Sequence, residues 1–178
     1  MNLPNLITIL RIFLIPAFII LLLYGHHPWA LAVFALAGIT DSLDGLIARA
    51  SNQRTELGTY LDPMADKLLL TAAFVTLSFL QTIPAWSAIV VVSRDLILIL
   101  GTLILHMTQT DLDITPSWLG KSTTVLQLIY ILVVLFLMVF QSETVILFPL
   151  LILTILLTII SGLHYIYRGI RSLNAELT

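Results

Sequence analysis

Four aspartates gather in one short stretch of this chain. Four of its seven aspartates fall within 26 residues, and apolar segments flank them on both sides. A carboxylate at membrane depth costs about 2.5 to 3.5 kcal/mol even on the mildest scale. A bound divalent cation is the simplest compensation, because hard cations prefer clustered carboxylate oxygens. The stretch therefore predicts a metal site in or beside a membrane, with the ligands Asp41, Asp44, Asp62 and Asp66.

The spacing of the aspartates favours a shared site. Asp41 and Asp44 are three residues apart, and Asp62 and Asp66 are four apart. On helices, each pair would occupy one face. The turn between the pairs, which includes residues 51–53, is short. It would make the two helices antiparallel neighbours, so the two pairs can converge.

Small residues and one arginine lie among the aspartates. Gly45, Ala48 and Gly58 remove side-chain bulk, and small residues in membrane helices let backbones or ligands approach closely. Arg49 adds a positive charge suited to a phosphate. Together these residues suit a nucleotide diphosphate held through metal ions, and two ions would stabilise the leaving phosphate. One aspartate remains to accept the proton of an incoming hydroxyl.

The composition predicts an integral membrane protein. Of 178 residues, 59% are hydrophobic and only 10% are charged, whereas a soluble domain has about a quarter charged residues. The net charge of −2 argues against a nucleic-acid partner. Because the chain has no cysteine, disulfides and thiolate chemistry are excluded.

The apolar runs predict an all-α membrane fold with six transmembrane helices. A span needs about 20 mostly apolar residues. Six segments fit, namely 6–24, 28–49, 57–80, 84–107, 121–140 and 144–167. They lack the period-two alternation of barrel strands. We expect residues 1–178 to form a single membrane domain.

The basic residues predict the orientation. They lie at or near the 2–3 loop, the 4–5 loop and the C-terminus: Arg49, Arg54, Lys67, Lys121, Arg168 and Arg171. The three opposite loops contain no Lys or Arg. Six spans place both termini on one side, and the positive-inside rule makes that side cytoplasmic. The aspartates are then expected in the cytoplasmic half of the second and third helices.

The motif resembles the signature of the CDP-alcohol phosphatidyltransferases, integral membrane enzymes of phospholipid synthesis. All eight fixed positions match: Asp41, Asp44, Gly45, Ala48, Arg49, Gly58, Asp62 and Asp66. The resemblance implies transfer of a phosphatidyl group from CDP-diacylglycerol to the hydroxyl of an alcohol, with release of CMP. It also implies a homodimer. We expect the protein in a bacterial inner (plasma) membrane, with its active site facing the cytoplasm.

The resemblance also implies roles for the motif residues. Asp41, Asp44 and Asp62 would bind two Mg²⁺ or Mn²⁺ ions, with Asp66 shared or close to the metals. Asp66 would be the base that deprotonates the acceptor hydroxyl. The small residues would line the cytidine diphosphate pocket with Arg49 nearby, and the implied CDP-binding set is Asp41, Asp44, Gly45, Ala48, Arg49, Gly58 and Asp62.

Two acceptors stay open. Residues 2–8, followed by Arg11 and Pro16, look like the start of glycerol-type members, which are phosphatidylglycerophosphate synthases and cardiolipin synthases. Their acceptors are glycerol-3-phosphate and phosphatidylglycerol. Many phosphatidylglycerophosphate synthases carry an Arg-Glu pair in the fourth helix and a further arginine beyond it. This chain has Ser93-Arg94-Asp95 and no basic residue in 96–105, which is more similar to cardiolipin synthases. Inositol phosphate and serine are alternative acceptors.

Charged residues outside the motif are candidates for binding the acceptor. Arg94, Lys121 and Arg168 are expected to face its phosphate. The alternative for Arg94 is a structural partner on another helix, and for the other two it is snorkelling to lipid phosphates. Adjacent helical residues point about 100° apart, so Arg94 is not expected to pair with Asp95. Gln127 is expected to reach the cavity or to bond a neighbouring helix.

A cation transporter is the alternative from another functional class. Such a protein would carry acidic residues at several depths along a pore. In this chain the aspartates cluster at one depth, and the outer halves of the helices lack acidic residues apart from Glu143. This distribution favours an enzyme over a transporter.

Overall fold

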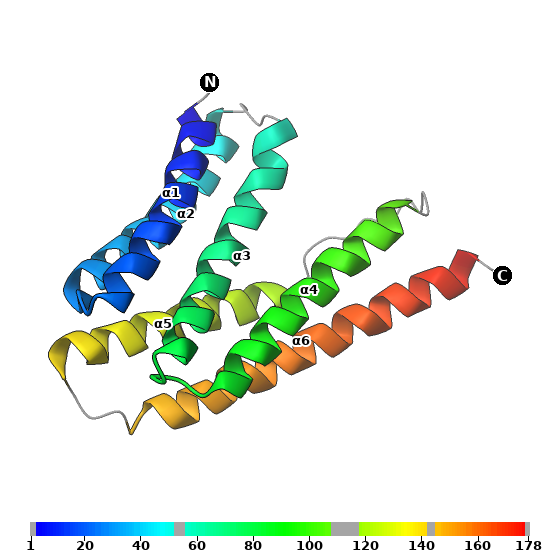
Figure 1. Cartoon of the computed structure of the whole chain (residues 1–178). Helices are drawn as coiled ribbons and strands as arrows, with labels where there is room; N and C mark the ends of the chain where they lie inside the picture. Colours follow the sequence, from blue (N-terminus) through cyan, green and yellow to red (C-terminus); the bar gives the residue numbers. More distant parts are fainter. Residues whose placement is uncertain (1–2, 52–55, 108–117, 142–144, 177–178) are drawn as a thin grey trace.

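The computed structural model describes residues 3–51, 56–107, 118–141 and 145–176, with side chains in 10–40, 67–101, 118–141 and 145–169. The described residues form six α-helices (Figure 1). Their bounds are α1 (Leu3–Leu23), α2 (His27–Ser51), α3 (Glu56–Phe79), α4 (Ala85–Met107), α5 (Trp118–Phe140) and α6 (Leu147–Glu176). The predicted all-α class and the six helices are confirmed, although α6 extends beyond the predicted segment.

The helices form two groups, α1–α3 and α4–α6, which meet where α3 packs against α4 and where α2 packs against α5. Helix α1 packs against both α2 and α3, the helices that carry the aspartates. Helix α4 packs against α3 and α6, and α5 packs against α2 and α6 (Figure 1). In Figure 1, the turns after α1 and α3 lie at the opposite end of the bundle from the start of α1 and the end of α6. The described ends of the first and last helices therefore lie on the same side of the bundle.

Two tight turns use the same cap. After α1, the Gly25 N–H donates to the Leu22 carbonyl and the His26 N–H to the Leu21 carbonyl. This pair of backbone hydrogen bonds is a Schellman motif, which needs a residue in the left-handed backbone conformation at its centre. Gly25 supplies that conformation with φ of 76°. The turn after α3 repeats the motif with Gln81 at the centre, at φ of 57°.

The core draws buried side chains from all six helices, and aromatic pairs join α1 to α2 and α3 to α5. Phe18 of α1 and Phe34 of α2 lie with ring centroids 5.4 Å apart, and Phe74 of α3 stacks on Tyr130 of α5 at 5.9 Å. Fully buried alanines at 30, 37 and 73 let the helix backbones approach closely. The core therefore holds the aspartate-bearing helices against α1 and α5.

Two of the described helices are long and apolar enough to cross a membrane. They are α5, with a mean hydropathy of 2.6, and residues 147–169 of α6, with 2.2. The parts of α1, α2 and α3 whose side chains are described are also apolar, at Leu10–Leu23, His27–Thr40 and Lys67–Phe79. Apolar side chains cover much of the outer surface, including Phe13, Phe79 and Leu163.

The two caps predict opposite effects of substitution. We expect Gly25→Ala to lower the free energy of unfolding by about 1 kcal/mol, because an L-residue at positive φ is strained. A Cβ at this position would meet nothing within 4 Å, so strain is its main cost. Conversely, Gln81→Gly should relieve strain and raise stability by about 0.5 kcal/mol after the entropy cost of glycine. Thermal unfolding of the purified protein in detergent measures both. Destabilisation by both variants would contradict this account of the caps.

Candidate active site

The aspartate motif lies on two helices that run through its positions without interruption. Asp41 and Asp44 lie in the second half of α2, and Asp62 and Asp66 in the first half of α3. The backbone is helical through both pairs, which is the condition for each pair to share a face. The side chains of the motif lie outside the described residues, so their predicted convergence stays a prediction.

Helix α1 contributes a buried cation to the same group of helices. Arg11 is 1% exposed, which makes it the largest fully buried side chain among the described residues. Its helix contacts both α2 and α3. A guanidinium buried to this extent belongs to the interior of the bundle and does not reach lipid phosphates.

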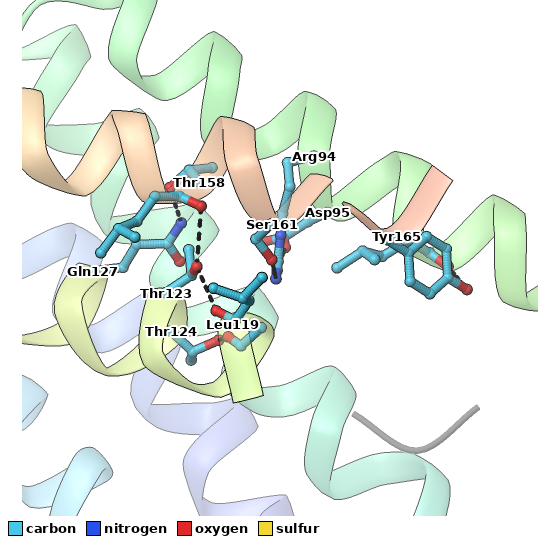
Figure 2. Close-up of polar contacts among 12 residues, drawn as sticks. Arg94, Asp95, Leu119, Thr123, Thr124, Gln127, Thr158, Ser161 and Tyr165 are labelled. Carbon is cyan, nitrogen blue, oxygen red and sulfur yellow. Dashed lines mark hydrogen bonds and ion pairs between the residues drawn. The ribbon is translucent and has the colours of Figure 1, made fainter. Parts of the chain in front are cut away.

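A buried polar bridge joins α4 to α6. The Arg94 Nη1 lies 2.8 Å from Asp95 Oδ1, and Arg94 Nη2 donates to Ser161 Oγ at 3.1 Å (Figure 2). Arg94 and Asp95 are each only 6% exposed. The expectation that these two neighbours would not pair is wrong. The arginine side chain is long enough to bend back across the angle between adjacent helical positions.

These contacts fit the structural alternative for Arg94. Both terminal nitrogens of the guanidinium are engaged within the protein, one of them by a residue of another helix. Hydrogen bonds to charged groups contribute about 1.5 to 3 kcal/mol each. The Arg94 Nε is buried and has no partner among the described residues. The bridge therefore has one donor left over.

Two glycines let α4 and α6 fit together around this bridge. A Cβ at Gly162 of α6 would lie 3.4 Å from the Arg94 Cγ, and a Cβ at Gly101 of α4 would lie 2.8 Å from Tyr165 Cε1. The Tyr165 hydroxyl lies 3.5 Å from the Leu98 carbonyl oxygen. Both the Arg94–Ser161 and the Leu98–Tyr165 contacts join residues 67 apart in the sequence. This constant offset shows that the two helices run parallel and in register.

Helix α5 is tied to α6 by a second set of polar contacts. Gln127 Nε2 donates to Thr158 Oγ1 at 3.0 Å, and the Thr123 hydroxyl lies 3.3 Å from the Leu157 carbonyl oxygen (Figure 2). Of the two roles expected for Gln127, the structure thus shows the bond to a neighbouring helix. Thr158 and Ser161 lie about one turn apart on α6, so this helix bonds α5 and α4 from consecutive turns.

Lys67 of α3 lies near the same bridge. It follows Asp66 directly in the sequence and is partly exposed. Its helix packs against α4, which carries Arg94 and Asp95. In the sequence, Lys67 is one of the basic residues that predict the orientation, and it is not among the predicted site residues. Lys67 follows the last motif aspartate, and its helix is joined to α4 by a tight turn. These two features were the sequence signal that Lys67 lies near α4.

The other two acceptor candidates lie at helix ends. Lys121 lies in the first turn of α5 and Arg168 lies towards the end of α6, and both side chains are exposed. The contacts described for Arg94 involve neither of them. The structure therefore leaves both of their expected roles open.

The bridge predicts a stability effect of Ser161→Ala. Loss of the hydroxyl leaves a buried guanidinium nitrogen without its acceptor, so the free energy of unfolding should fall by about 1 to 2 kcal/mol. Ser122→Ala is the matched control, because the exposed Ser122 hydroxyl donates only to the Trp118 carbonyl of its own helix. It should change stability by less than about 0.5 kcal/mol. Thermal unfolding in detergent compares the two, and equal effects would exclude the bridge as a stabilising contact.

Comparison with known proteins yields one family. The family model described as CDP-alcohol phosphatidyltransferase matches residues 1–160. A protein of Mycobacterium tuberculosis named "Probable phosphatidylglycerophosphate synthase" is 36% identical over 180 residues, which covers 97% of this chain and 83% of that protein.

Two shorter matches carry different names. A human protein named "Cardiolipin synthase (CMP-forming)" is 44% identical over 99 residues, 55% of this chain and 33% of that protein. A Pseudomonas fluorescens protein named "CDP-diacylglycerol--glycerol-3-phosphate 3-phosphatidyltransferase" is 45% identical over 106 residues, 54% of this chain and 52% of that protein. The family match covers most of the chain and includes every position of the aspartate motif, so this protein belongs to the CDP-alcohol phosphatidyltransferase family.

Proposed function

We propose that this enzyme transfers a phosphatidyl group from CDP-diacylglycerol to the hydroxyl of a glycerol-type acceptor and releases CMP. The observation that carries the proposal is the complete eight-position motif, placed on two helices that share α1 as a neighbour. The acceptor oxygen forms a bond to the phosphorus that carries diacylglycerol. The bond from that phosphorus to the oxygen of CMP breaks, and CMP leaves with the electron pair.

The donor set of the motif fits hard divalent cations. Four carboxylates supply the oxygen ligands that Mg²⁺ and Mn²⁺ prefer, and we propose Asp41, Asp44, Asp62 and Asp66 as the residues that hold two ions. The ions would supply electrostatic stabilisation of the diphosphate. Among the residues whose side chains are described, no group of three or more acidic or histidine side chains offers another such site.

The remaining motif residues bind and orient the two substrates. Asp66 accepts the proton of the acceptor hydroxyl as that oxygen attacks. Gly45, Ala48 and Gly58 leave room for cytidine diphosphate, and Arg49 donates hydrogen bonds to a phosphate.

The acceptor is glycerol-3-phosphate or phosphatidylglycerol. Relatives that are similar to this chain are named for both products, phosphatidylglycerophosphate and cardiolipin. Lys121 and Arg168 are proposed to attract the acceptor phosphate from the exposed ends of α5 and α6, where they also suit lipid phosphates. Arg94, already bonded to Asp95 and Ser161, contributes to the acceptor site by fixing α4 against α6.

The site is proposed to work at the cytoplasmic face of a bacterial plasma membrane. All six helices would span the bilayer as one domain, with both termini in the cytoplasm, and two copies would form a homodimer. The common side of the described ends of α1 and α6 supports this topology (Figure 1), as do the apolar outer surfaces. CMP would then leave into water while the lipid tails stay in the bilayer.

The role of Asp66 predicts a large loss of turnover in Asp66→Asn. General bases contribute about 100- to 10,000-fold to rate, so CMP release should fall by at least about 100-fold. The KM for CDP-diacylglycerol should change far less, because the other three aspartates remain. Asp111→Asn, outside the motif, is the matched control and should retain activity. An Asp66→Asn enzyme with intact turnover would remove Asp66 from the role of base.

The choice of acceptor predicts a single preferred product. Purified enzyme with CDP-diacylglycerol and a divalent cation should release CMP with glycerol-3-phosphate or with phosphatidylglycerol, and chelation of the cation should stop the reaction. Mass spectrometry separates phosphatidylglycerophosphate from cardiolipin directly. Release of CMP with serine or inositol phosphate alone would contradict the proposed acceptor class.

A further inference from the structure

A close contact between α2 and α5 sets how these two helices lie against each other. A Cβ at Gly38 of α2 would lie 3.6 Å from the Leu128 Cδ1 of α5. The two helices pack together, and in Figure 1 the end of α5 lies near the start of α2, so they run in opposite directions. The second half of α2, which carries Asp41 and Asp44, therefore lies alongside the first half of α5.

This register places Thr124 of α5 level with the start of the aspartate motif. Thr124 precedes Leu128 by four residues, which is one turn on the same face and about 6 Å along the axis. Asp41 follows Gly38 by three residues, which is about one turn and about 4.5 Å along α2. Because the helices are antiparallel, both steps lead in the same direction from the contact. Thr124 and the backbone of Asp41 are therefore at nearly the same level.

Thr124 lies on a different side of α5 from the polar residues that join this helix to α6. The Thr123 hydroxyl lies 3.3 Å from a carbonyl oxygen of α6, and Gln127 donates to a threonine of α6 (Figure 2). Among the described residues, the Thr124 hydroxyl donates only within its own helix, to the Gly120 carbonyl oxygen at 3.1 Å. Thr124 therefore offers a polar group on the side of α2.

The face of α5 that includes Thr124 becomes more open towards the motif. The side chains of Leu128 and Thr124 are partly buried, whereas that of Lys121, about one turn further on, is exposed. On α2, Gly45 lies about one turn beyond Asp41 in the same direction. Gly45 is among the residues proposed to leave room for cytidine diphosphate. The open part of the interface therefore coincides with the proposed donor site.

A threonine hydroxyl can change its partner when a phosphate binds. It has one proton to donate and rotates to suit its surroundings. A hydrogen bond to a charged oxygen is about twice as strong as one between neutral groups. The Gly120 carbonyl would keep the bond from the Thr124 backbone N–H that the α-helix supplies. The change therefore leaves no helix carbonyl without a donor.

We infer that the Thr124 hydroxyl donates a hydrogen bond to the diphosphate of CDP-diacylglycerol, so that α5 completes the donor site opposite α2. This inference rests on the proposed function and adds to it a binding residue outside the eight-position motif. It requires the hydroxyl of Thr124 for recognition of the donor and not of the acceptor.

The first experiment measures the Kd of CDP by calorimetry in the presence of Mg²⁺. Thr124→Val keeps the shape of the side chain but removes the hydroxyl, and it should weaken binding by about 10- to 100-fold. Thr124→Ala also lacks the hydroxyl and gives the same test if the valine variant does not fold. Thr124→Ser keeps the hydroxyl and should bind CDP more tightly than either.

Thr123→Val is the matched control at the neighbouring position. It removes a hydroxyl that lies on the side of α6, so it should lower thermal stability and leave the Kd of CDP unchanged. In turnover assays, Thr124→Val should raise the KM for CDP-diacylglycerol and leave the KM for the acceptor nearly unchanged.

The outcomes separate the inference from the proposed function. If wild type releases CMP and Thr124→Val binds CDP as tightly as wild type, the inference is overturned and the proposed function stands. Equal weakening by Thr123→Val and Thr124→Val, or a rise in the KM for the acceptor alone, also overturns the inference. If wild type binds CDP through Thr124 but releases no CMP with either acceptor, the proposed function fails and the binding residue stands. If wild type does not bind CDP, the inference is overturned.

Discussion

Every charge inside an apolar helical bundle must find its compensation within the bundle. Water is absent from the interior of a bilayer, so an unpaired charge or donor there is costly. The Arg94–Asp95–Ser161 bridge meets this constraint by closing an ion pair within α4 and bonding it to α6. The same constraint underlies the proposal that the four aspartates of the motif hold cations.

The helices were predictable because their signal is local. Apolar runs and turn residues set the six segments, and the helix bounds in the structure lie close to them except at the end of α6, which extends to Glu176. The Arg94–Asp95 pairing was not predictable from helical angles, because it depends on the reach of a flexible side chain. The bond from Arg94 to Ser161 was not predictable either, because a lone serine in an apolar run gives no sign of its partner, which lies 67 residues away.

The residues of the candidate site also differ in how well the sequence predicts them. The aspartate motif was predictable because its residue types recur at spacings that place them on one face of each of two helices. The residues proposed for the acceptor site lie on α4, α5 and α6, so they carry no common spacing in the sequence. A single sequence therefore indicates the reaction more clearly than the substrate.

The packing of α4 against α6 constrains how the sequence can vary at the positions where the two helices touch. Each helix contributes one glycine and one large side chain: Gly101 receives Tyr165, and Gly162 receives Arg94. A Cβ at position 101 would lie 2.8 Å from Tyr165 Cε1, so a larger residue there is tolerable only if residue 165 becomes smaller or moves aside. Positions 101 and 165 should therefore vary together among related proteins. Such paired variation would trace the parallel register of these two helices through lineages in which the individual residues have changed.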